Sequence, residues 1–400
     1  MMKPIPFLIA ASFLAIASPA LAGTISVEAG PDAQARLQAA LIDAKPGDTV
    51  AIGAGRFDLT DGLSLDIDGV TVRGAGPGAT VLSFKGQKGA GEGLLVTADD
   101  VVLRGFAVED SRGDGIKSKA AHRIVYHDLR VEWTGGPKAS NGAYGVYPVE
   151  STDVLIDKVT VKGASDAGIY VGQSRNIIVR NSLAMFNVAG IEIENSYNAD
   201  VYLNVATRNT GGILVFDLPN LPQKGGHAVR IFSNRSEGND TPNFAPKGNV
   251  VAGVPNGTGV IVMANRDVHV FNNILGENGS TNVFIVGYRQ EFTDTGYNPL
   301  PANVAVHDNV HGRAGFAPGP QFEGGPQMVA TMGSVPPVVW DGTGSNIRVT
   351  DKVATLSLGL TDPKGRATSA NPQLVDLGGG AEIAPLAPVV LPPSMEAAIR

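Results

Sequence analysis

Hydrophobic and polar residues alternate in short runs along most of this chain. In runs such as Gly168-Ile169 and Gly190-Ile191, the first and third residues after the glycine are apolar. Side chains alternate across a β-strand, so these apolar residues point to one side of a sheet. A second alternating run, such as Ile177-Ile178-Val179, follows in each unit. The runs are too short and too rich in Val and Ile for helices, so they predict short β-strands.

The strand starts recur at a nearly fixed spacing. Most intervals are 22 or 23 residues, while 115 to 145 spans 30 residues and 212 to 259 spans 47, so the surplus must be loop. A fixed coil length without hairpin turns predicts an all-β, right-handed parallel β-helix of the pectin-lyase type, in which residues about 22 positions apart are neighbours in space. The starting dipeptides are Gly93-Leu94, Gly115-Ile116, Gly145-Val146, Gly168-Ile169, Gly190-Ile191, Gly212-Ile213, Gly259-Val260 and Asn282-Val283.

Asn or Asp tends to follow the second strand of a coil. Asparagine tolerates the left-handed backbone conformation of a tight bend and can bond its own backbone. On stacked coils such residues would form a ladder, in an approximate register. The residues concerned are Asn181, Asn204, Asn234, Asn272 and Asp308.

The ends of a solenoid expose its core and need caps. Residues 31–44 carry a helical pattern, with Leu37 and Leu41 four positions apart, and we expect this helix to cap the first coils. The domain then comprises residues 23–311. Residues 312–400 lose the repeat and gain Pro and Gly, so we expect an irregular segment. Its Pro-rich stretch 383–393 would be extended, either covering the far end or hanging loose.

The first residues have the pattern of an export signal. Lys3 is followed by the apolar stretch 7–17 and by Ala20-Leu21-Ala22, a small-x-small cleavage site. Cleavage after Ala22 would place the mature chain in the periplasm or outside the cell. No later stretch approaches the roughly 18 apolar residues of a membrane span, so none is expected in the mature chain.

Composition excludes several classes of function. The chain contains no cysteine, which rules out disulfides, thiolate metal sites, cysteine nucleophiles and covalently attached haem. A net charge of −7 argues against a nucleic-acid partner.

Three phrases in the sequence resemble known proteins. "LQAALIDAKPGDTVAIGAGRFDL" is similar to the N-terminal segment of many pectin-lyase-fold proteins. "YGVYPVESTDVLIDKVTVKGASDAGIYVGQSRNIIVRNSLAMFNVAGIEIENS" and "GGILVFDLPNLPQKGG" resemble a family of exported bacterial parallel β-helix repeat proteins, frequently encoded next to a dihaem-type cytochrome c. The resemblance covers roughly residues 30–310. It implies the fold and a c-type cytochrome as a partner, but no transferable chemistry.

Outward-facing residues of successive coils form two columns, because the coils are about 4.8 Å apart. Both columns have a polar middle between apolar ends, and the two long intervals flank that middle. The first column reads Leu95, Lys117, Tyr147, Tyr170, Glu192, Leu214, Ile261 and Phe284, and the second reads Thr97, Lys119, Val149, Gly172, Glu194, Phe216, Met263 and Val286.

Two interpretations of this face stay open. It is either a groove floor, with carboxylates for acid–base work or Ca²⁺ binding and tyrosines for sugar stacking, or an ordinary solvated sheet face. On the first interpretation Glu192 and Glu194 are also candidate metal ligands. The candidate catalytic residues are Tyr147, Tyr170, Glu192, Glu194, Asp217 and His227, and the candidate substrate-binding residues are Lys117, Lys119, Asp166, Arg230, Asn243 and Lys247.

Two hypotheses of function follow. One is a binding or accessory protein that recognises a glycan or a protein partner such as a cytochrome c. The apolar end of the outward columns would then be its binding interface. The alternative is a lyase or C5-epimerase acting on an acidic polysaccharide. Catalytic phrases of known β-helix enzymes, such as the Asp-Pro-His-Asp of uronan epimerases, are absent from the sequence.

Overall fold

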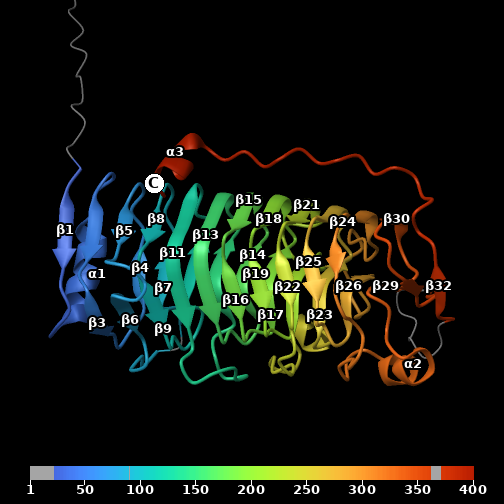
Figure 1. Ribbon diagram of the computed structural model, residues 1–400. Coiled ribbons are helices and arrows are strands. Elements are labelled where there is room, and N and C mark those ends of the chain that lie inside the picture. Colours follow the sequence, from blue (N-terminus) through green and yellow to red (C-terminus); the bar gives the residue numbers. More distant parts are fainter. Residues whose placement is uncertain (1–21, 90, 362–370) are drawn as a thin grey trace, which may run out of the picture.

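The computed structural model describes residues 22–89, 91–361 and 371–400, so the export signal expected over residues 1–22 lies almost entirely outside the described residues. The chain winds into one elongated stack of parallel coils, which confirms the predicted β-helix (Figure 1). Inward Val, Ile and Leu side chains from successive coils form one continuous buried core. In the described part of the chain, no helix is long and apolar enough to cross a membrane.

One side of the stack is a sheet of twelve described strands, here called sheet B. Its strands pair in parallel with the equivalent strand of the next coil, except the last strand, which pairs antiparallel. The strands are β4 (Leu63–Leu65), β7 (Leu94–Val96), β10 (Ile116–Lys119), β12 (Tyr144–Val149), β14 (Ala167–Gly172), β17 (Ala189–Glu194), β20 (Gly211–Phe216), β23 (Thr258–Met263), β26 (Thr281–Val286), β29 (Val338–Trp340), β31 (Thr355–Ser357) and β32 (Gln373–Val375).

The remaining sides form sheet A, which has twenty described strands in two arms joined at a bend. Strands β11 (Ile124–Glu132) and β13 (Thr152–Lys162) run through the bend and belong to both arms. The first arm also holds β1 (Thr24–Val27), β2 (Thr49–Ile52), β5 (Thr71–Arg73), β8 (Val102–Arg104), β15 (Arg175–Arg180), β18 (Tyr197–Tyr202), β21 (His227–Phe232), β24 (Arg266–Phe271), β27 (Ala302–His307) and β30 (Ser345–Val349). The second arm also holds β3 (Gly55–Asp58), β6 (Thr80–Ser83), β9 (Ala107–Glu109), β16 (Leu183–Met185), β19 (Val205–Thr207), β22 (Arg235–Glu237), β25 (Ile274–Gly276) and β28 (Val310–His311).

The predicted outward columns of sheet B are confirmed for the residues that form the strand ladder. Lys117 lies beside Tyr147, Tyr170 beside Glu192, and Glu192 beside Leu214. The second column continues from Glu194 through Phe216 to Met263 and Val286. The repeat length alone therefore gave the correct neighbours.

The bend between the two arms of sheet A contains two adjacent columns of residues, which the sequence analysis treated as one ladder. Asn181, Asn272 and Asp308 adopt the left-handed backbone conformation, with φ of 52°, 54° and 57°. Asn204 and Asn234 instead lie one position later, in a ladder along the stack. The Asn234 side-chain oxygen accepts from the backbone amide and the side-chain amide of Asn204 on the preceding coil, and Asn273 accepts from Asn234 in the same way. The ladder comprises Ser182, Asn204, Asn234, Asn273, Asn309 and Asp351.

A second asparagine ladder runs along the other end of the second arm. It joins Asn187, Asn209, Asn239 and Asn278 by side-chain bonds of 3.1–3.2 Å, and all four residues are fully buried. Each amide donates to the next carbonyl oxygen, so these buried polar groups are satisfied along the stack.

The N-terminal cap agrees with expectation. Helix α1 (Ala33–Asp43) follows β1 and packs on β1, β2, β3 and β4 at the first end of the stack (Figure 1). Leu37 and Leu41 are buried in the core, so the helix closes the open end.

The stack continues further than residue 311, where we expected the repeat to end. Strand β29 pairs with β26, and β30 pairs with β27, so another coil is added after the irregular stretch that contains α2 (Gly325–Met332). The sequence hid this coil because its strands are short and Pro and Gly separate them.

The Pro-rich stretch 383–393 neither covers the far end nor hangs loose. It runs back along the first arm of sheet A to α3 (Pro393–Ala397), which lies near β8 (Figure 1). Glu396 forms an ion pair with Arg180 at 2.8 Å, and Arg104 donates to the Ala398 carbonyl oxygen at 2.6 Å. Val389, Leu391 and Met395 are buried against outward apolar residues of β11, β13 and β15.

Replacing Asn234 by Ala should lower the free energy of unfolding by about 2–3 kcal/mol, because it leaves buried partners on the coils before and after it without bonds. Urea unfolding measures this change. Asn298→Ala is the control, since Asn298 is exposed and accepts one bond from the Leu300 amide. An equal loss of unfolding free energy in the two variants would contradict a stabilising role of the ladder.

Candidate functional site

An insertion between two coils covers the polar middle of sheet B. The segment 238–257, which includes the short 3-10 helix η1 (Val250–Gly253), lies on the outward face of the strands. Val251 and Val254 are buried there against Tyr170, Leu214 and neighbouring apolar residues. Asn243 fixes the segment's shape, because its side-chain amide donates to the Val251 and Val254 carbonyl oxygens at 2.8 and 2.9 Å.

Three carboxyl groups lie beneath this segment, and we call them the carboxyl cluster: Asp166, Glu192 and Glu194. They are 7%, 1% and 8% exposed. The Tyr170 hydroxyl donates to Glu194 Oε1 at 2.6 Å, and Glu192 lies two residues before Glu194 on the same strand. From the covering segment, the Asn249 amide donates to Asp166 Oδ2 at 3.1 Å. These groups are therefore not the floor of an open groove.

Burial raises the pKa of each carboxyl in the cluster. It raises the pKa of Asp166 to about 7 and that of Glu194 to about 7, against the bonds from Asn249 and Tyr170 that favour the charged forms. The pKa of Glu192 is raised well above its ordinary value by burial, and further by the nearby charges of Asp166 and Glu194. Near neutral pH the cluster consequently retains protons.

Across residues 22–89, 91–361 and 371–400, no group of three or more carboxylate or imidazole side chains is placed to hold a metal ion. Glu192 Oε2 is buried without a hydrogen-bond partner, and Asn249 presents a donor, not a ligand oxygen, to Asp166. Binding of Ca²⁺ by Glu192 and Glu194 stays a prediction.

Next to the cluster, three tyrosine rings pack together. The ring centroids of Tyr144 and Tyr147 are 4.5 Å apart, and that of Tyr170 is 4.3 Å from Tyr144 and 4.9 Å from Tyr147. Tyr147 is only partly buried, and its pKa is raised to about 12 by burial and by nearby carboxylates. The Lys117 ammonium lies 4.9 Å from the Tyr147 ring centroid.

Lys117 is held by two acids. Its Nζ lies 3.2 Å from Glu92 Oε1 and 3.9 Å from Asp114 Oδ2. Burial raises the pKa of Asp114 to about 6, and Lys117 opposes that rise. This part of the face is accessible, while Tyr170 and the carboxyl cluster are closed off.

Two expected site residues, His227 and Arg230, lie away from the cluster, whereas Asp217 is close enough to Glu194 to raise the pKa of that carboxyl. Asp217 accepts bonds from the Gly225 and Gly226 amides at 3.2 and 2.8 Å, which shapes the 217–226 turn. His227 and Arg230 belong to β21 of sheet A, so they do not lie on the sheet B face with the other candidates. The His227 ring stacks on Tyr197, and Arg230 is paired with Asp200 on the outward side of sheet A.

Two expected lysines are exposed and lie apart from one another. Lys119 ends β10, and Lys247 lies in the covering segment. The structure therefore brings together Tyr147, Tyr170, Glu192, Glu194, Asp166 and Lys117, and it adds Tyr144 and Asn249, which the sequence analysis missed.

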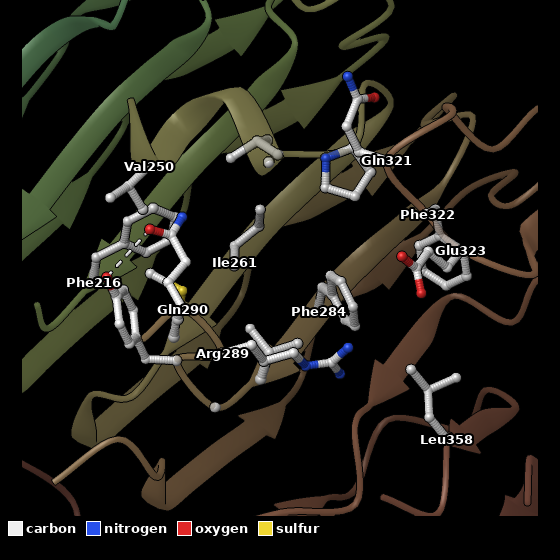
Figure 2. A pocket seen from close by; sticks show the side chains of 17 residues that line it. Phe216, Val250, Ile261, Phe284, Arg289, Gln290, Gln321, Phe322, Glu323 and Leu358 are labelled. Carbon is white, nitrogen blue, oxygen red and sulfur yellow. Dashed lines mark hydrogen bonds between the residues drawn. The ribbon is translucent and has the colours of Figure 1, made fainter. Parts of the chain in front are cut away.

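A pocket of about 400 Å³ opens on the same face, over the apolar end of the columns (Figure 2). Its floor consists of outward residues of β20, β23 and β26, including Phe216, Ile261 and Phe284. Val250 and Val254 of the covering segment form one wall, and Phe322 and Leu358 form another. The patch that the sequence suggested as an interface is thus neither fully exposed nor fully covered: it is the floor of a cavity.

Polar groups gather at the rim of this pocket. Arg289 and Gln290 come from the insertion 287–301, and Gln321 and Glu323 come from the stretch before α2. Arg289 lies 3.5 Å from Asp341, but its Nε is buried without a hydrogen-bond partner, as is Gln321 Oε1. A guanidinium and an amide beside aromatic rings suit a ligand that has both apolar faces and hydrogen-bonding groups.

The sequence analysis missed the rim residues. The coil spacing from 259 to 282 is regular, so it carries no sign of the insertion that follows Val286. The number of residues between the two strands of that coil does indicate the insertion. Sixteen positions separate Val286 from Ala302, compared with three between Glu194 and Tyr197.

Comparison with known proteins identifies the architecture. The profile of the family described as "Right handed beta helix region" matches residues 68–222 and 139–315. The A-module of mannuronan C-5 epimerase AlgE4 from Azotobacter vinelandii is similar in structure, with a TM-score of 0.57, 17% identity, and coverage of 73% of this chain and 87% of that one. No curated protein matches the sequence.

Two further solved structures show a weaker likeness. The A-module of mannuronan C-5 epimerase AlgE6, also from Azotobacter vinelandii, has a TM-score of 0.49 at 16% identity, covering 79% of this chain and 87% of that one. An alginate lyase from Paenibacillus sp. str. FPU-7 has a TM-score of 0.38 at 17% identity, covering 73% and 97%.

Replacing Glu192 by Gln should stabilise the chain at about pH 8, by on the order of 1–3 kcal/mol, and have little effect at about pH 4. The folded-state pKa is raised, so the wild-type chain loses stability as the pH rises, whereas the amide carries no charge at any pH. Urea unfolding at both pH values measures the difference. The control is Glu277→Gln at an exposed ion pair with Arg313; a matching gain in that variant would refute this assignment.

Proposed function

The chain belongs to the family of right-handed β-helix proteins, and on that basis we propose that it is an exported binding protein whose ligand is a glycan. The observation that carries this proposal is the pocket over the apolar end of sheet B. It combines a floor of aromatic and aliphatic side chains with a polar rim, and three inter-coil segments wall it.

The chemistry of the pocket favours a sugar over a purely apolar ligand. Phe284 offers an aromatic ring in the floor, on which the apolar face of a sugar could stack. Arg289 Nε and Gln321 Oε1 are an unpartnered donor and acceptor, and a buried polar group without a partner is costly. A ligand rich in hydroxyl groups would satisfy both.

A binding role also fits the state of the carboxyl cluster. Acid–base catalysis needs side chains within reach of a substrate, whereas Glu192 and Glu194 lie beneath the covering segment. The proposal of export rests on residues 1–22. A c-type cytochrome as a protein partner rests on the sequence resemblance alone, and we place the glycan first.

The alternative is a lyase or C5-epimerase for an acidic polysaccharide, and one observation favours it. Tyr147 and Lys117 lie together on the accessible part of the face, with Asp114 beside them. A phenol could remove the proton next to a uronate carboxyl, and the ammonium could neutralise that carboxyl. The polysaccharide would then bind along the solvated ends of β10 and β12.

The binding proposal is tested with a panel of immobilised uronate, neutral hexose and amino-sugar oligosaccharides. We expect a member of the panel to bind, and Phe284→Ala to weaken that binding by about tenfold through loss of ring stacking. Calorimetry on the bound oligosaccharide measures the change. Phe316→Ala is the control, because Phe316 is an exposed ring outside the pocket lining. A panel without any binding would end this proposal.

The enzymatic alternative predicts a different set of results. Incubation with polyuronates should then give the absorbance of an unsaturated product for a lyase, or a changed NMR spectrum of the polymer for an epimerase. Tyr147→Phe should lower that activity by at least about a hundredfold, whereas Tyr202→Phe on sheet A should not. Silence in both assays across the polymers would remove the alternative.

A further inference from the structure

One short stretch of the covering segment touches both the carboxyl cluster and the ligand pocket. Asn249 donates to Asp166 on the cluster side. The residues directly after it, Val250, Gly253, Val254 and Pro255, line the pocket. A displacement of this stretch would therefore break the bond to the cluster and remove a pocket wall together.

Three acids make up the cluster, and the largest effects on their pKa values come from burial, from one another and from hydrogen bonds. The groups that face it are acids, phenols and amides, while the nearby cations Lys117 and Arg266 act on Asp114 and Asp217. The covering segment brings no charge to it, since Lys247 is exposed and Asp240 pairs with Arg208. The facing groups are Asp114, Tyr144, Tyr147, Tyr170, Asp217, Tyr288, Tyr297 and Asn249.

Apolar contacts oppose the release of the stretch. Val251 and Val254 are buried on the outward face, and Gly257 donates to the Thr210 carbonyl oxygen at 3.0 Å. Burying three ionised carboxyls without a cation costs far more than burying them protonated, and lifting the stretch would give the carboxyls more contact with water. The balance between these two effects then depends on the number of protons held.

We propose that the carboxyl cluster is a proton-operated latch: with protons shared among Asp166, Glu192 and Glu194, the stretch 249–255 stays seated and completes the pocket, and ionisation of the cluster releases it. The ligand-binding consequence rests on the proposed function. The movement of the stretch does not, because it depends only on contacts within the chain.

The direction of the effect follows from linkage. With the stretch lifted, the carboxyls meet water and regain ordinary pKa values near 4, whereas seated they titrate near 7 for Asp166 and Glu194. The seated state thus binds more protons, and opening becomes more favourable as the pH rises from about 4 to about 7. The pKa of Glu192 is raised well above its ordinary value in the seated state, so this carboxyl extends the effect to higher pH.

Hydrogen exchange tests the latch without a ligand. We expect exchange of the Ala252, Val254 and Gly257 amides, corrected for its intrinsic pH dependence, to accelerate by about tenfold per pH unit for each proton released. All three amides donate to backbone carbonyls while the stretch is seated. Helix α1, which lies at the first end of the stack away from the cluster and is measured in the same samples, should not follow this profile. A flat corrected profile for the stretch would overturn the proposal.

Variants separate the latch from general destabilisation. The double substitution Glu192→Gln and Glu194→Gln should flatten the profile and keep the stretch protected at about pH 8. Asp240→Asn is the matched control, since it removes a carboxylate of the same segment outside the cluster, and it should keep the wild-type profile. If the double variant fails to fold, the wild-type profile still decides. Protection at about pH 8 that requires added Ca²⁺ would show a cation-held cluster and overturn the proton latch.

The ligand arm distinguishes the two proposals. An oligosaccharide that binds the pocket should bind about tenfold or more weakly at about pH 8 than at about pH 5, and the double variant should remove that difference. Binding that is independent of pH while the stretch opens would leave the movement standing and refute its coupling to the pocket. A panel without ligands together with a pH-dependent stretch would refute the proposed function and leave the latch intact.

Discussion

Hydrogen bonding between successive coils is the interaction on which the rest of this structure depends. Each strand pairs with the strand about one coil earlier, so the positions of the side chains are fixed by the length of the coil. The length is maintained at the bends, where single left-handed residues turn the chain. Buried Asn and Ser side chains directly after them bond the next coil. Columns of like residues are the direct result.

The candidate site arises where extra residues interrupt this regularity. The regular coils would leave Glu192 and Glu194 on a solvated sheet, with ordinary acidity. The segment 238–257 covers them, and burial changes the carboxyls from charged surface groups into proton-holding ones. The same insertion, together with 287–301 and the stretch before α2, walls the pocket. The regular coils fix the positions of the side chains, and the insertions determine which of these side chains are exposed to water.

The fold was predictable because backbone pairing makes the repeat visible at the level of residue types. Tyr170, Glu192 and Leu214 could be placed side by side from their spacing alone. The same reasoning could not tell whether Glu192 faced water, since the covering segment follows no period and docks through Val251 and Val254. The last coil was missed because β29 and β31 have three residues each.

The C-terminal tail that lies along sheet A changes how a stack of coils can unfold. A linear array can lose repeats one at a time from an unprotected end, as each repeat contacts only its neighbours. Here the tail leaves the last coils, bonds His269 and Asp200 on its way, and ends on Arg180 and Arg104. Detaching the final coil therefore strains the bonds that the tail makes many coils away. Local unfolding at that end is consequently coupled to the middle of the molecule.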